Sequence, residues 1–152
     1  MFLDRFALSL LAFAVPALPA AAGSELPGLY RAVVERVVDG DTLAVRATIW
    51  LDQEVRVLVR LRGIDAPELR ARCAAEKAQA LAATDALAAL VTDPAVTLSE
   101  VESDKYGGRV VADVRDAKGR DLGALLLQEG LVRAYAGGHR DGWCGKLSLK
   151  AD

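Results

Sequence analysis

The run from Glu54 to Arg62 constrains the fold most, because apolar and charged side chains alternate along it. Valine and leucine occupy one side, and the arginines occupy the other together with Leu58. A period of two predicts a β-strand with one face in a hydrophobic core. The side chains opposite this core face include Arg56, Arg60 and Arg62.

A loop rich in charged groups follows this strand. Gly63 breaks the alternation, and Asp65, Pro67 and Glu68 come next. Two guanidiniums and two carboxylates within ten residues, VRLRGIDAPE, suit a site that holds a phosphate together with a metal ion. Alternatively, Asp65 caps the following turn and Glu68 is a solvated acid at the start of a helix.

The other periodic segments predict an α+β fold. Three strands, a helix, two strands and a short helix do not form a βαβ repeat, and this order favours a small, partly open β-barrel around one packed helix. The other predicted strands are Tyr30–Val38, Thr42–Trp50, Ala95–Val101 and Arg109–Arg115, with 131–135 extended. The alanine-rich helix begins between Pro67 and Ala74 and ends before Asp93, and the short helix covers 121–129.

The first 22 residues predict a secretory signal peptide, because an apolar run from Phe6 to Ala17 precedes three small residues. An uncleaved anchor is the alternative, although the run is short for a span and is followed by Pro19. We therefore expect a signal peptide at 1–22, a linker at 23–29, a barrel domain at 30–146 and a tail at 147–152. The mature protein is expected to be a periplasmic or secreted monomer without stable membrane association.

The net charge of −2 gives no broad attraction to nucleic acid, so any phosphate site must be a local cluster of cations. The chain has two cysteines, Cys73 and Cys144. An even count in an exported protein favours a disulfide, and two free thiols are the alternative. Two cysteines without a CxxC motif and a single histidine, His139, make a structural zinc site unfavourable.

Two further segments carry charged groups in turns. Asp39-Gly40-Asp41-Thr42 is typical of a hairpin turn, and a function for Asp41 requires a partner carboxylate elsewhere. Asp104 to Arg109 (DKYGGR) also fits a glycine hairpin turn with charged flanks. In a functional interpretation, its Lys105 and Arg109 bind phosphate and Tyr106 offers a flat surface to a sugar or base.

Three motifs, VDGDT at 38–42, VRLRGIDAPE at 59–68 and DKYGGR at 104–109, resemble the active-site motifs of the staphylococcal nuclease (thermonuclease) family. Their order and approximate separations also match, and the resemblance covers about residues 33–135. It implies a five-stranded OB-fold barrel with helices. It further implies an exported, calcium-dependent endonuclease that hydrolyses DNA and RNA, prefers single strands and leaves 3′-phosphate ends.

The resemblance also implies the ligands of the metal ion and the base. Asp41 and Asp65 would bind Ca²⁺, and the backbone carbonyl of Ala66 would complete the protein ligands. Glu68 would act as the general base or orient the attacking water. Ala66 stands where the family commonly has threonine, so a carbonyl ligand is retained and a side-chain hydrogen bond is lost.

For the phosphate, the resemblance implies that Arg60 stabilises the transition state and that Arg109 lies near the leaving 5′-oxygen. Lys105 and Tyr106 would contact a neighbouring phosphate. Many members of the family have arginine directly after the first glycine, whereas Gly108 here delays it by one residue. Such a shift reverses a side chain in a regular strand. We therefore expect a glycine bulge at 107–108 to restore its direction.

This chemistry is coherent, because guanidiniums and a divalent ion neutralise the charge that develops on a phosphodiester while a carboxylate deprotonates water. With His139 as the single histidine, a histidine-based nuclease or a Ser-His-Asp triad is disfavoured. A non-catalytic OB-fold module that binds nucleic acid or protein is the alternative function, since a fold alone does not establish activity.

Overall fold

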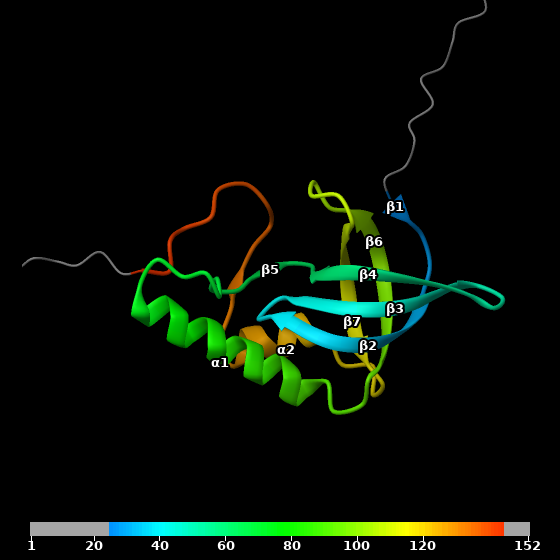
Figure 1. Ribbon diagram of the computed structural model, residues 1–152, viewed down its shortest axis with the longest axis horizontal. Helices are drawn as coiled ribbons and strands as arrows, with labels where there is room; N and C mark the ends of the chain where they lie inside the picture. The colour runs from blue at the N-terminus through cyan, green and yellow to red at the C-terminus, as the bar shows by residue number, and fades with distance from the viewer. Residues whose placement is uncertain (1–24, 145–152) are drawn as a thin grey trace, which may run out of the picture.

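The computed structural model describes residues 25–144. Its central feature is an antiparallel meander that continues into a closed barrel (Figure 1). The barrel order is β6-β2-β3-β4-β7, and a further β6–β7 pairing closes it. The five strands are β2 (Tyr30–Asp39), β3 (Thr42–Trp50), β4 (Gln53–Leu61), β6 (Ala95–Ser103) and β7 (Arg109–Asp116). The predicted α+β, OB-type barrel is thus confirmed.

Alternation in β4 places Val59 and Leu61 in the core, as the sequence predicts. They pack with Leu43 and Val45 of β3, and all four side chains are at most 2% exposed. Because β4 and β7 run parallel, Arg60 lies opposite Val111 on the neighbouring strand. The barrel therefore fixes the strand end at which the charged loop begins.

Helix α1 (Ala74–Leu90) crosses one end of the barrel, and the shorter α2 (Leu122–Gln128) lies behind it in the view of Figure 1. Cys73 caps α1 by accepting a hydrogen bond from the Glu76 backbone N–H through its sulfur. The helix thus begins at the late end of the predicted range. Asp121 caps α2 by accepting from the Ala124 N–H at 2.8 Å, which satisfies a backbone donor in the first turn.

The β2–β3 turn packs closely against α1. A Cβ atom added at Gly40 would lie 2.7 Å from the Ala83 Cβ and 2.9 Å from the Ala66 Cβ. Both atoms are fixed to the backbone, so neither can move aside by a rotamer change. A side chain at position 40 would therefore clash with these alanines, and glycine allows the turn that carries Asp41 to pack directly against the helix.

Short pairings tie the ends of the domain to the barrel. Within the predicted linker, β1 (Glu25–Leu26) pairs with β6. Strand β5 (Ile64–Asp65), inside the predicted loop, pairs with β8 (Arg133–Ala134). The predicted signal peptide and the 147–152 tail lie outside the described residues. Within 25–144, neither helix is long and apolar enough to span a membrane.

The predicted disulfide between Cys73 and Cys144 is confirmed, with 6.0 Å between the Cα atoms. It joins residues 71 positions apart and holds the end of the described chain against the start of α1. A loop of this length corresponds to roughly 4 kcal/mol of stabilisation in the chain-entropy model.

Candidate active site

A buried ion cluster lies where β4 leaves the barrel. The Arg60 Nη1 atom is 2.8 Å from Asp41 Oδ2, and Nη2 is 3.2 Å from Asp65 Oδ1. Nη2 also donates to the Ile64 carbonyl at 3.1 Å. The three charged residues are each no more than 8% exposed. The structure therefore brings together the first two sequence motifs through one guanidinium.

Asp41 is held firmly at the end of the β2–β3 turn. Its carboxylate accepts hydrogen bonds from the Thr42 hydroxyl at 2.9 Å and the Ala66 N–H at 3.0 Å. Burial raises the pKa of Asp41 to about 6, although the Arg60 charge and the Ala66 hydrogen bond act in the opposite direction. A buried carboxylate in this setting is stabilised by additional positive charge.

A cavity of about 140 Å³ opens beside this cluster. Glu68 lies on its wall with a side chain that is 62% exposed, in contrast to the buried aspartates. On the loop after β4, Asp65 is therefore buried whereas Glu68 is exposed to solvent. The cavity is lined by Asp39, Asp41, Arg60, Ala66, Pro67, Glu68, Tyr106, Arg109 and Arg140.

The third sequence motif forms the β6–β7 turn on the opposite wall. Arg109 Nε is 2.5 Å from Asp104 Oδ2, and its guanidinium lies 5.1 Å from the centre of the Tyr106 ring. Lys105 Nζ lies at the same distance from this ring. Arg109 and Tyr106 line the cavity with Arg60 and Glu68, whereas Lys105 lines a neighbouring groove.

The expected glycine bulge at 107–108 is not found. The irregular register between β6 and β7 lies between Ser99 and Glu102. Gly108 instead adopts a left-handed conformation with φ of 78° in the turn, and Arg109 is the first residue of β7. A turn that ends in left-handed glycine suffices to place Arg109 on the cavity wall.

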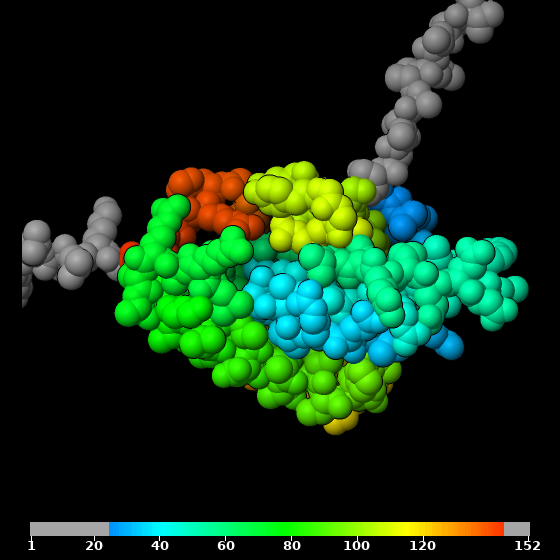
Figure 2. Space-filling view, viewed as in Figure 1, coloured from blue at the N-terminus to red at the C-terminus, as the bar shows by residue number. Residues whose placement is uncertain are grey.

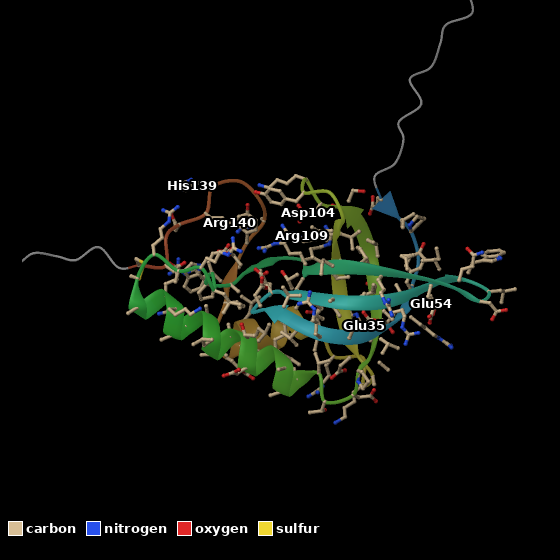
Figure 3. All side chains as sticks on the ribbon, in the orientation of Figure 1. Glu35, Glu54, Asp104, Arg109, His139 and Arg140 are labelled. Atoms are coloured by element: carbon tan, nitrogen blue, oxygen red, sulfur yellow. A yellow bond between two sulfur atoms is a disulfide. The ribbon has the colours of Figure 1, made fainter. Side chains whose placement is uncertain are left out.

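The C-terminal loop, residues 137–144, completes the site, although the sequence predicts no site residue within it apart from Cys144 of the disulfide. Arg140 Nε lies 3.2 Å from Asp65 Oδ1, and Nη1 lies 3.4 Å from Glu68 Oε1. The Trp143 Nε1–H donates to Asp65 Oδ2 at 3.3 Å. Figure 3 shows Arg140 and Arg109 projecting toward the same space from the C-terminal loop and from β7, whereas His139 lies farther out on the loop.

The start of α1 also fixes the loop that carries Glu68. The buried Glu76 carboxylate accepts a hydrogen bond from the Arg72 N–H at 3.0 Å and a longer one from the Glu68 N–H at 3.5 Å. Within residues 25–144, Glu76 also forms the one cluster of three metal-ligand side chains, with Cys73 and Cys144. Because these sulfurs form the disulfide, this cluster is not a metal centre.

A closed five-stranded barrel with two helices defines an OB-fold protein, and beside its cavity a buried arginine lies between two aspartates. The family model described as staphylococcal nuclease homologue matches residues 58–143, and the chain belongs to this family. The match begins within β4, so Asp41 lies outside it and is joined to it by Arg60. No curated protein matches the chain.

Proposed function

We propose that this protein is an exported, calcium-dependent endonuclease that hydrolyses DNA and RNA, prefers single strands and leaves 3′-phosphate ends. Membership of the staphylococcal nuclease family supports nuclease-type chemistry on nucleic acid. The observation that carries the proposal is that Arg60 and Asp41 line one cavity with the exposed Glu68, while the Arg60 guanidinium also pairs with the buried Asp65 behind it.

The family is generally calcium-dependent, and the residues of this site fit such an ion. Asp41 and Asp65 present carboxylate oxygens to the same guanidinium, and hard cations prefer oxygen ligands. Burial raises the pKa of Asp41, so its carboxylate would be stabilised by additional positive charge nearby. These two side chains and the Ala66 carbonyl would hold the ion, which would supply positive charge next to a phosphate.

Glu68 is assigned the role of general base. Its carboxylate lies at the cavity wall and is largely exposed, so water can reach it. A base must lie within hydrogen-bond reach of the proton that it removes. The backbone contact from Glu68 to Glu76 limits the movement of its loop.

The cationic side chains are assigned to the phosphate. Arg60 is buried and planar, and a guanidinium fork matches two phosphate oxygens. Arg109 lies on the opposite wall, where it would stabilise charge on the leaving oxygen. Tyr106 and Lys105, on the β6–β7 turn, would bind an adjacent nucleotide.

Digestion of a labelled single-stranded oligonucleotide tests this function. We expect cleavage that requires calcium and stops with excess EGTA, and products that end in 3′-phosphate. Binding of the oligonucleotide without any product in calcium would instead indicate a non-catalytic OB-fold module. Comparison of single-stranded DNA, duplex DNA and RNA at equal concentration tests the proposed preference for single strands.

Export, removal of residues 1–22 and a monomeric periplasmic or secreted protein are part of this proposal. Support comes from the disulfide, because such bonds persist in oxidising compartments. N-terminal sequencing of the protein from fractionated cells and size-exclusion chromatography of the purified protein test these points. A cytoplasmic protein that retains its first residues would contradict the proposed export.

A further inference from the structure

Arg140 has a position that the proposed roles above do not use. Its guanidinium contacts Asp65 and Glu68, the two acids of the loop that follows β4. It also lies 5.2 Å from the centre of the Tyr135 ring, which restricts the orientation of its plane. The side chain is 33% exposed, so solutes can reach it.

Three hollows of the surface meet at Arg140. One is the cavity beside Glu68, and the second is a groove of about 500 Å³ between the β6–β7 turn and residues 135–138. The third, of about 380 Å³, lies beside Trp143. In the space-filling view, the orange-red C-terminal loop and the yellow-green β6–β7 turn are neighbours along the upper edge of the molecule (Figure 2). A single-stranded nucleic acid that leaves the cavity along the groove or past Trp143 would pass the Arg140 guanidinium.

The charges around the groove favour a polyanion over a neutral ligand. Lys105, Arg109 and Arg140 all line it, with Asp104 as the acidic residue among them. The protein has a net charge of −2, so attraction for a nucleic acid backbone must come from such a local group of cations. The ion pair of Arg140 with Glu68 is partly exposed, and pairs of this kind stabilise a fold little.

We propose that Arg140 is a substrate-binding residue that contacts a backbone phosphate adjacent to the one that is cleaved, and that the disulfide holds it in place. This inference rests on the proposed nuclease function, whose cavity it extends. Arg140 would thus add a guanidinium from outside the three sequence motifs to the substrate-binding surface. This addition would lengthen the surface along the bound nucleic acid strand.

The C-terminal loop is fastened at several points. Cys144 is bonded to Cys73, and the Trp143 indole donates to Asp65. Arg133 lies 3.7 Å from the centre of the Trp143 ring and donates to the Gly142 carbonyl at 3.2 Å. Because Arg140 lies between this anchor and β8, opening the disulfide should reduce its contribution to binding.

Salt-dependent binding of a labelled single-stranded decamer tests the phosphate contact. The assays use E68Q as the background and contain excess EGTA, so that the strand is not cut. Loss of one contact from single-stranded nucleic acid should reduce the slope of log affinity against log salt by about 0.7. We expect R140A to show this smaller slope and to bind the decamer about tenfold more weakly, and R140K to retain the slope. R56A is the control and should match the parent, because Arg56 pairs with Glu35 away from the site.

An unchanged slope in R140A would overturn the proposal. If the wild-type protein neither binds nor cuts the strand, the proposed nuclease function fails instead. If it cuts the strand and R140A keeps the parental slope, only the assignment of Arg140 fails. The two failures are therefore distinguishable.

A calcium titration separates substrate binding from a structural role. Removing Arg140 takes a competing cation from Asp65, so R140A should bind calcium at least as tightly as the parent while it binds the decamer more weakly. Loss of both calcium and decamer affinity would indicate a damaged site and would contradict the proposal. Isothermal titration calorimetry provides both measurements.

The role of the disulfide is tested by non-additivity. We expect C73S/C144S to weaken decamer binding, and R140A added to it to weaken binding less than R140A weakens the parent. If the losses of decamer affinity caused by R140A and by C73S/C144S simply add in the combined variant, the link between the disulfide and Arg140 is overturned. Thermal unfolding shows at which temperature each variant is folded, and if C73S/C144S does not fold, mild reduction of the intact protein replaces it.

Discussion

Arg60 and Asp41 form a buried ion pair, with Nη1 2.8 Å from Oδ2 and with both residues at most 8% exposed. The same guanidinium pairs with Asp65, so its single positive charge is shared between the two carboxylates that are proposed to hold calcium. Arg60 and a calcium ion therefore offer alternative sources of positive charge to these acids. Several consequences for stability and activity can be measured.

Replacing Arg60 with alanine should destabilise the calcium-free protein strongly. Loss of one partner leaves buried carboxylates without compensation, which costs about 3–5 kcal/mol. Added calcium should recover much of this loss, because it binds the folded state. Urea unfolding of R60A and wild type, with and without calcium, measures the difference, and an equal loss in both conditions would contradict a shared site.

Replacing Glu68 with glutamine should lower turnover by about 100-fold, the usual scale for a general base. Its side chain is 62% exposed, so the thermal unfolding temperature should hardly change. E54Q is a matched control, because Glu54 is a partly exposed acid that pairs with Arg46 away from the site (Figure 3). Turnover close to wild type in E68Q would remove Glu68 from the role of base.

Replacing Gly40 with alanine should destabilise the fold by about 1–3 kcal/mol, the usual cost of overpacking. The added methyl group would lie 2.7 Å from the Ala83 Cβ, so the turn or α1 must shift. G107A serves as the control, because a Cβ there meets no atom within 4 Å. Chemical unfolding of the two variants measures the effect, and equal stability would contradict the close packing of Gly40.

Asp116 should contribute stability that is lost in acid. Partial burial acts to raise its pKa, but hydrogen bonds from the Arg120 and Lys118 backbones and the Arg120 guanidinium outweigh burial and lower the pKa below 3.8. A carboxyl whose folded-state pKa is depressed stabilises the protein above the unfolded-state pKa and loses this effect as pH falls through the folded-state pKa. The stability difference between wild type and D116N should therefore be largest near neutral pH and shrink below pH 4 in urea unfolding.

The sequence predicted the barrel from its succession of short strands, and the clear period of two in β4 matches the burial of Val59 and Leu61. It also predicted that Arg60 and Asp65 lie together, since they are neighbours at one strand end. The distant Asp41 was placed through the resemblance of its motif. The sequence leaves the start of α1 open between Pro67 and Ala74, since the observed cap, Cys73, is not among the common capping residues that mark such a boundary.

The C-terminal part of the site could not be predicted. Strands β5 and β8 are two residues each, which is too short for any alternation to be recognised. Arg140 and Trp143 lie in a glycine-rich segment without periodicity, and only the tertiary contacts of the folded chain bring them to Asp65. The cysteine pair was the single signal that this segment returns to the barrel.

The alanine-rich composition of α1 acquires a geometric meaning from the contact between Gly40 and Ala83. Small side chains on the buried face allow the helix to lie close to the β2–β3 turn, and the turn carries Asp41. The bulk of residues on this helix therefore sets the position of a carboxylate in another part of the chain. Enlarging Ala83 should therefore displace the turn that carries Asp41 without touching Asp41 itself, so the helix acts as a spacer beneath that turn.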